Sequence, residues 1–216
     1  MSLPKACLFD LDGVIVDTVD AHFKAWKAMA DELGVHFTEV ENEQLKGVSR
    51  RDSMKSILKM GDIVKTEDEL FDLTERKNAI YVDIISKMTP QDILPGVVEF
   101  LRVLKKSEIA VAIGSSSKNA PTILKAVGLD DMFEVVIDGN CITRSKPDPE
   151  VFLKGAEALH LDPSECLVLE DAISGVRAAK NAGMKVIGVG EVEHLNEADL
   201  VVPDLENLEL DLLKDL

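Results

Sequence analysis

The 216-residue chain is poor in cysteine and contains no long hydrophobic run. Its three cysteines, Cys7, Cys141 and Cys166, are far apart in the sequence and form no Cys-x-x-Cys pair. An odd number of isolated cysteines argues against a disulfide scaffold and against a zinc or redox motif. No apolar stretch approaches the roughly 18 residues of a membrane span. Asp10 and Asp12 interrupt the first apolar run, which argues against a signal peptide. These absences predict a soluble protein of the reducing cytoplasm.

Positive charge is also scarce. The chain has 24 Lys and Arg against 40 Asp and Glu, which gives a net charge of −16. Nucleic acids and anionic membranes both attract basic surfaces, so neither is an expected partner. Because 46% of the residues are hydrophobic, the acidity does not indicate disorder. We expect a monomer with a small-molecule partner. If that partner is phosphorylated, local cations must attract it.

Short β-branched runs alternate with amphipathic helices, which is the pattern of a parallel sheet. The predicted strands are Ala6–Phe9, Ile109–Ile113, Glu134–Ile137, Cys166–Leu169 and Lys185–Val189, with Leu200–Val202 as an edge strand. The predicted helices between them are Val97–Lys106, Ala120–Val127, Glu150–Leu159 and Ala172–Ala182. We therefore expect an α/β fold built on a doubly wound parallel sheet.

The segment 19–94 interrupts this alternation, because it contains no convincing strand. Apolar residues at spacings of three and four predict helices over His22–Leu33, Glu41–Lys46, Arg51–Met60 and Glu67–Met88. Pro95 and Gly96 mark the return to the alternating pattern. We expect a core domain of residues 1–18 and 95–216, with an inserted all-helical cap of residues 19–94.

The first chemical motif is Asp10-Leu11-Asp12-Gly13, at the end of the first predicted strand. Ligands bind at this end of the strands in doubly wound sheets. Two carboxylates this close repel each other, which predicts a divalent cation or unequal pKa values. Taken alone, the motif is more simply interpreted as a solvated turn at the end of a strand.

The second motif is Gly114-Ser115-Ser116-Ser117-Lys118-Asn119, which follows the second predicted strand and opens a helix. Backbone N–H groups, hydroxyls and an ammonium converge there, as an anion site requires. A serine cluster can also serve only as a helix cap.

The third motif is Ser145-Lys146-Pro147-Asp148-Pro149, in which the prolines restrict the loop that presents Lys146. A surface lysine without a function is the simpler interpretation of this motif taken alone.

The fourth motif, Glu170-Asp171, again follows a strand, and paired carboxylates suit a hard cation. The order of all four motifs at strand ends is far more specific than any one of them.

With these motifs, the chain resembles the phosphotransferases of the haloacid dehalogenase superfamily over its whole length. Within the superfamily, the cap segments 20–26, 46–50 and 76–78 resemble those of the β-phosphoglucomutase family. The segment Lys46-Gly47-Val48-Ser49-Arg50 is similar to that family's substrate-specificity loop.

The resemblance implies that Asp10 is a nucleophile forming an aspartyl-phosphate and that Asp12 is the general acid and base. It implies Mg²⁺ held by Asp10, the backbone carbonyl of Asp12, and Asp171, with Glu170 assisting. The resemblance implies that Ser115 and Lys146 bind the phosphoryl group that is transferred. It implies that the other phosphate is bound by Arg50, Ser117, Lys118 and Asn119. The further residues that it implies for binding the substrate are Thr18, His22, Lys46, Gly47 and Lys77.

The implied activity is interconversion of β-glucose 1-phosphate and glucose 6-phosphate through glucose 1,6-bisphosphate. A phosphatase acting on a small sugar phosphate shares all four motifs and is the alternative. It needs no second phosphate site, whereas a mutase must hold one phosphate while the other reacts, a task that suits the planar fork of Arg50. A catalytically inactive binding module would have lost at least one of the motif residues, and all are present.

Overall fold

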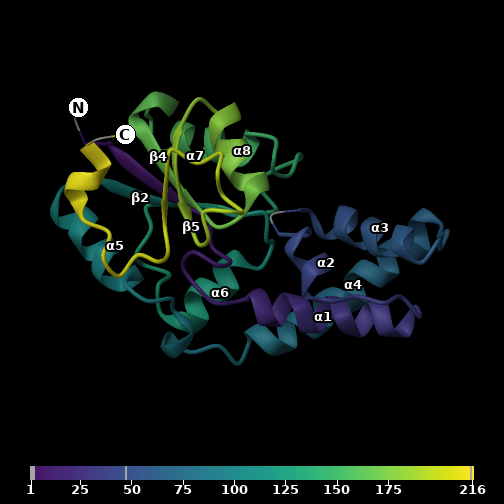
Figure 1. Ribbon diagram of the computed structural model, residues 1–216. Coiled ribbons are helices and arrows are strands. Elements are labelled where there is room, and N and C mark those ends of the chain that lie inside the picture. Colours follow the sequence, from purple (N-terminus) through teal and green to yellow (C-terminus); the bar gives the residue numbers. More distant parts are fainter. Residues whose placement is uncertain (1–2, 47, 215) are drawn as a thin grey trace.

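The computed structural model describes residues 3–46, 48–214 and 216, and within these residues six strands pair into one sheet (Figure 1). The strands are β1 (Ala6–Phe9), β2 (Ala110–Gly114), β3 (Val135–Ile137), β4 (Cys166–Glu170), β5 (Lys185–Val189) and β6 (Leu200–Val202). Their order across the sheet is β3-β2-β1-β4-β5-β6, and each neighbouring pair is parallel. The predicted α/β fold is confirmed.

The strand order reverses at β1, because the chain first builds the sheet outward through β2 and β3 and then outward on the other side through β4 to β6. Phe9 is in register with Ile113 of β2 and with Leu169 of β4. The residues that follow these three positions therefore lie side by side at the carboxyl edge of the sheet. This reversal point is where doubly wound sheets bind ligands.

Helices cover both faces of the sheet, because alternate residues of each buried strand point to opposite faces. Cys7 and Phe9 pack in one hydrophobic cluster with residues of α5 (Val97–Lys106) and α6 (Ala120–Val127). Ala6 and Leu8 pack in a second cluster with residues of α7 (Glu150–Ala158) and α8 (Ile173–Asn181). Three short 3₁₀ helices are also present among the described residues: Pro90–Asp92, Pro163–Glu165 and Leu210–Lys214.

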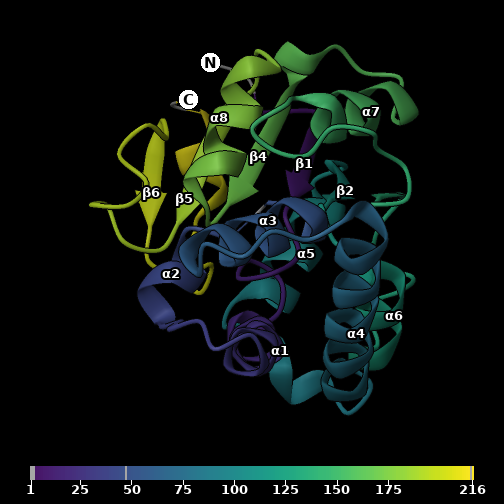
Figure 2. The ribbon, with the colours of Figure 1, turned by 90° about the vertical axis from the view of Figure 1, so that its right-hand side faces the viewer.

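The segment after β1 forms four helices among the described residues: α1 (Val19–Glu32), α2 (Glu39–Glu43), α3 (Arg50–Met60) and α4 (Glu67–Ile85). Helices α1 and α4 lie side by side in both views (Figures 1 and 2). Their far ends share a third hydrophobic cluster with α3, which includes Trp26, Met54 and Leu73. Tyr81 and Ile85 of α4 instead join the cluster that contains Phe9, so the helical segment packs directly against the core.

Several helix ends differ from the predicted ones by a few residues. Thr38 and Glu41 form a capping box, so α2 begins at Glu39, before the predicted Glu41, and it ends at Glu43, before the predicted Lys46. Helix α1 begins three residues earlier than predicted, at Val19, and α4 ends three residues earlier, at Ile85. Within the described residues, no helix combines the length and the apolar character that crossing a membrane requires.

Candidate active site

The predicted motifs converge at the carboxyl edge of the sheet, around Asp10. The Asp10 N–H donates to the carbonyl of Leu169 at 2.9 Å, and the Ser115 N–H donates to the carbonyl of Ile137 at 3.0 Å. These backbone hydrogen bonds extend the sheet pairing by one residue beyond β1 and β2. They fix the direction in which the Asp10 and Ser115 side chains leave the sheet.

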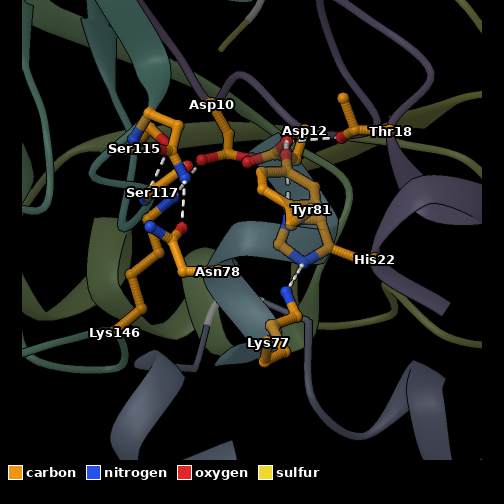
Figure 3. A network of polar contacts seen from close by, with 11 residues as sticks. Asp10, Asp12, Thr18, His22, Lys77, Asn78, Tyr81, Ser115, Ser117 and Lys146 are labelled. Atoms are coloured by element: carbon orange, nitrogen blue, oxygen red, sulfur yellow. Dashed lines mark hydrogen bonds and ion pairs between the residues drawn. The ribbon is translucent and has the colours of Figure 1, made fainter. Parts of the chain in front are cut away.

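Lys146 is buried against two of the carboxylates. Its Nζ donates to Asp10 Oδ1 at 2.6 Å and to Glu170 Oε1 at 2.8 Å (Figure 3 shows Lys146 and Asp10). Its side chain has no exposed surface, and it also lies over the ring of Phe152. A buried ammonium is tolerated only when it is paired, and here it has two carboxylate partners.

Burial dominates the electrostatics of the carboxylates. It raises the pKa of Asp10 to about 7, although the Lys146 ammonium opposes the shift. It raises the pKa of Asp171 to about 6, against the opposing charge of Lys46. The pKa of Lys146 rises despite its burial, because Asp10 and Glu170 stabilise the ammonium. An added cation would therefore stabilise the ionised carboxylates further.

Asp10, Glu170 and Asp171 could hold a metal ion, since one carboxylate oxygen from each lies within 4.8 Å of the others. A Cβ atom at Gly13 would lie 2.3 Å from Asp171 Oδ2, so this glycine leaves the space that the carboxylate occupies. Both Glu170 oxygens already accept hydrogen bonds, from Lys146 and from the Ala172 N–H. Oxygen donors of this kind fit a hard divalent cation, with Asp10 and Asp171 as the more available carboxylates.

Asp12 lies next to Asp10 and faces the helical segment (Figure 3). Its Oδ1 accepts hydrogen bonds from the Thr18 hydroxyl and, at 3.3 Å, from the Tyr81 hydroxyl. His22 Nε2 lies 3.8 Å from the same oxygen. Burial raises the pKa of Asp12, and the two hydroxyl donors oppose that shift.

His22 connects Asp12 to Lys77 of α4. Lys77 Nζ lies 3.0 Å from His22 Nδ1 and packs over the rings of Trp26 and Tyr81. Burial lowers the pKa of His22 well below its ordinary value, with help from Lys77 and Arg50, which favours the neutral ring. Burial, with Arg50, also lowers the pKa of Lys77 to about 7. When Lys77 donates to Nδ1, the ring hydrogen of His22 is at Nε2, on the side of Asp12.

The remaining predicted polar groups come from the helical segment and from the loops at the carboxyl edge of the sheet. Arg50 Nη1 lies 3.0 Å from Glu75 Oε1, and Lys46 Nζ lies 3.2 Å from Asp171 Oδ2. The Asn119 amide donates to Asn78 Oδ1 at 3.0 Å, which joins the loop after β2 to α4. The Ser117 hydroxyl accepts from the Asn119 N–H.

One cavity of about 390 Å³ brings these groups together. The predicted site residues that line it are Asp10, Asp12, Thr18, His22, Lys46, Arg50, Lys77, Ser115, Ser117, Lys118, Asn119 and Asp171. Lys146 and Glu170 are buried behind Asp10, and Gly47 lies outside the described residues.

Sequence reasoning missed Glu75, Asn78 and Tyr81 as site residues, although all three line the cavity. Tyr81 follows Lys77 by four residues, which places both side chains on one face of a helix. That spacing was the available signal for Tyr81. The same helical spacing also relates Glu75 to Asn78 and Asn78 to Tyr81, which are three residues apart in each case, and Asn78 lies in the segment 76–78 noted above.

Comparison with known proteins agrees with this geometry. The family model described as haloacid dehalogenase-like hydrolase matches residues 7–189. A β-phosphoglucomutase of Bacillus subtilis is 44% identical over 97% of this chain and 93% of its own length. A phosphorylated carbohydrates phosphatase of Thermotoga maritima is 31% identical over 89% of this chain and 88% of its own length.

A crystal structure of β-phosphoglucomutase from Clostridium difficile superposes with a TM-score of 0.94 and 37% identity. The match covers 99% of this chain and 96% of that protein, so both the sheet and the inserted helices are included. The chain therefore belongs to the haloacid dehalogenase superfamily and, within it, to the β-phosphoglucomutase family.

Proposed function

We propose that this chain interconverts β-glucose 1-phosphate and glucose 6-phosphate through an aspartyl-phosphate and a bound glucose 1,6-bisphosphate. One observation carries the proposal: a single cavity contains Asp10 and Asp12 together with cations from the helical segment and polar groups from the loop after β2. Such a cavity can hold a molecule with two phosphates, one at Asp10 and one between Arg50 and Asn119.

Asp10 is the nucleophile of this proposal. Its carboxylate oxygen attacks the phosphorus atom, and the bond from phosphorus to the sugar oxygen breaks, which splits one difficult transfer into two easier ones. Lys146 holds the carboxylate in place at 2.6 Å and, with Ser115, stabilises the negative charge on the phosphoryl oxygens.

Asp12 is the general acid and base. It accepts the proton of the sugar hydroxyl that attacks the aspartyl-phosphate and returns a proton to the sugar oxygen that leaves. Thr18, Tyr81 and His22 position its carboxylate. Because Tyr81 and Lys77 belong to α4, movement of this helix changes the hydrogen bonds around Asp12.

The cation of this proposal is Mg²⁺, held by Asp10, the backbone carbonyl of Asp12, and Asp171, with Glu170 assisting. When bound, it neutralises charge on the transferring phosphoryl group. Mg²⁺ gives up its bound waters reluctantly, so a site with few protein carboxylates suits it.

Residues 19–94 form the cap domain of this proposal, and residues 1–18 and 95–216 form the core domain. Arg50, with Ser117, Lys118 and Asn119, binds the phosphate that is not being transferred. Lys46 and Gly47 belong to the same substrate-binding loop. Closure of the cap over the sugar excludes water from Asp10, so that a sugar hydroxyl reacts in its place.

Removal of the cation should stop the reaction. We expect EDTA to eliminate turnover and Mg²⁺ to restore it. Asp171→Ala should raise the Mg²⁺ concentration for half-maximal activity or eliminate activity, because few carboxylates hold the ion. The measurement is initial rate against Mg²⁺ concentration, and full activity in metal-free buffer would contradict the cation site.

Arg50→Lys and Arg50→Ala separate binding of the second phosphate from chemistry at Asp10. Lysine keeps the charge but loses the planar fork. Loss of one charge-assisted hydrogen bond, roughly 1.5–3 kcal/mol, should lower kcat/KM for β-glucose 1-phosphate about 10- to 100-fold. Phosphorylation of Asp10 by acetyl phosphate should fall much less, since that donor has no second phosphate.

Both reactions are measured in the wild type and in both variants, with Arg102→Lys as the matched control. Arg102 forms an exposed pair with Glu99 on α5 and does not line the cavity, so both rates of this variant should stay at the wild-type level. Equal losses in both reactions would mean that Arg50 supports the fold, and no loss in mutase activity would place the second phosphate elsewhere.

The second candidate is a sugar-phosphate phosphatase, which the 31% identity to the Thermotoga maritima phosphatase favours. Its aspartyl-phosphate would react with water. The deciding experiment supplies β-glucose 1-phosphate with and without glucose 1,6-bisphosphate and measures both glucose 6-phosphate and free phosphate. The proposal predicts glucose 6-phosphate as the main product and stimulation by the bisphosphate, whereas stoichiometric release of phosphate would support the phosphatase.

A further inference from the structure

The ion pair between Lys46 and Asp171 joins the helical segment to one of the carboxylates of the cation site. Lys46 Nζ lies 3.2 Å from Asp171 Oδ2 and 3.0 Å from Glu43 Oε2. The Asp171 side chain is only 9% exposed. An ammonium so close to a nearly buried carboxylate cancels part of the charge that attracts a cation. Lys46 and a divalent cation therefore compete for the same group.

A second contact holds the main chain of Lys46 to the core. The Ser174 hydroxyl, in the first turn of α8, donates to the carbonyl oxygen of Lys46 at 3.0 Å. Both the side chain and the main chain of Lys46 are therefore attached to the short segment 171–174. If the ammonium leaves Asp171, one of these two attachments between the helical segment and the core is lost.

Two cavities meet at this ion pair. In the part of the chain that the structure describes, a second cleft of about 750 Å³ lies beside α2, and Val19, Lys46 and Asp171 line both cavities. Acidic side chains line much of the second cleft: Asp17, Glu39, Glu43, Glu191 and Asp204. Because like charges in a cleft raise the local concentration of counter-ions, cations can approach Asp171 from the side away from the sugar-phosphate cavity.

We propose that Lys46 is a built-in competitor of the divalent cation. The ammonium occupies Asp171 until the cation displaces it, and the displacement releases the side chain of Lys46 from the core. This proposal rests on the cation site of the proposed function and gives Lys46 a role separate from binding the sugar phosphate. Because coupling is reciprocal, Lys46 weakens cation binding by the same factor by which the cation weakens the ion pair.

Direct binding of metal alone tests the competition. Lys46→Met keeps most of the length of the side chain and removes its charge. Mn²⁺ binding to the substrate-free protein is followed by the electron paramagnetic resonance of free Mn²⁺. Mg²⁺ binding is obtained by competition with Mn²⁺. We expect the dissociation constant of the variant to be about five- to tenfold lower than that of the wild type, the scale of one partly buried ion pair.

Two further variants make the result specific. Lys46→Arg keeps the positive charge and should keep the wild-type dissociation constant within about twofold. Lys87→Met removes an equal charge from an exposed pair with Asp83, in which both side chains are 70% exposed, and should also leave it unchanged. An equal gain in Lys87→Met would attribute the effect to net charge and overturn the proposal.

Amide hydrogen exchange of residues 43–46 measures the release of this segment from the core directly. Mg²⁺ should speed exchange there in the wild type, whereas Lys46→Met should exchange fast with or without the ion. Equal or weaker Mn²⁺ binding by Lys46→Met would overturn the competition while leaving the cation site intact. A wild type that binds no Mn²⁺ at all would overturn the cation site of the proposed function as well.

Discussion

Asp10→Asn should have no detectable turnover and should keep its fold. The amide is nearly the same size as the carboxylate, and its oxygen can still accept a hydrogen bond from Lys146. The amide cannot, however, act as the nucleophile, and it is a weaker ligand for a cation. Burial disfavours the charge of Asp10, and Lys146, which loses that charge as a partner, keeps its ion pair with Glu170. We therefore expect a melting temperature close to that of the wild type.

The measurement combines turnover with trapping of labelled phosphoprotein from acetyl phosphate. The wild type should carry label that maps to Asp10, and the variant should carry none. Asp31→Asn is the matched control, since Asp31 is an exposed carboxylate that pairs with Lys27 on α1 and lines neither cavity, and it should label and turn over normally. Label on the Asp10→Asn protein, mapped to another residue, would contradict the assignment of the nucleophile.

Asp12→Ala should lower kcat for the mutase reaction about 10²- to 10⁴-fold, the usual contribution of general acid–base catalysis. Asp12 is next to the nucleophile and is held by Thr18 and Tyr81, so its proton transfer depends on geometry that alanine cannot supply. Phosphorylation of Asp10 by acetyl phosphate should be much less affected, because acetate leaves readily without a proton.

The rate of phosphoryl transfer to the sugar is compared with the rate of Asp10 phosphorylation by acetyl phosphate. A loss confined to the first reaction indicates lost proton transfer, whereas a loss in both indicates a damaged site. Asp20→Ala, which removes an exposed carboxylate paired with Lys24 on α1, is the control and should behave as the wild type. Similar losses in both half-reactions would assign Asp12 to the structure or the cation site. An unchanged rate and pH profile for transfer to the sugar would exclude Asp12 as the acid and base.

Much of the site around the sheet follows from the sequence, for a simple physical reason. Parallel strands bring their carboxyl ends to one edge, so polar residues that end or follow apolar strands must meet there. Asp10, Ser115 and Glu170 are such residues, and the register of β1 with β2 and β4 places them side by side. The prediction that all four motifs lie at strand ends is wrong for Lys146, which lies in a loop nine residues after β3 and is fully buried against Asp10 and Glu170.

The contacts across the cavity could not be predicted in the same way. Helical periodicity identifies the buried face of α1 or α4 but not the residue that this face contacts. The hydrogen bond between Tyr81 and Asp12 and that between Asn78 and Asn119 depend on how the helices pack on the core. The same holds for the ion pair of Lys46 with Asp171, whose partners are far apart in the sequence.

The central claim is that the phosphoryl group on Asp10 passes to a sugar hydroxyl in preference to water. The most direct measurement labels Asp10 with acetyl [³²P]phosphate, removes the donor, adds unlabelled β-glucose 1-phosphate and Mg²⁺, and follows the label by rapid quench. The proposed function predicts that the label leaves the protein much faster with the sugar phosphate than without it and appears in glucose 1,6-bisphosphate and glucose 6-phosphate. Label that appears in inorganic phosphate at the same rate with and without the sugar would contradict it.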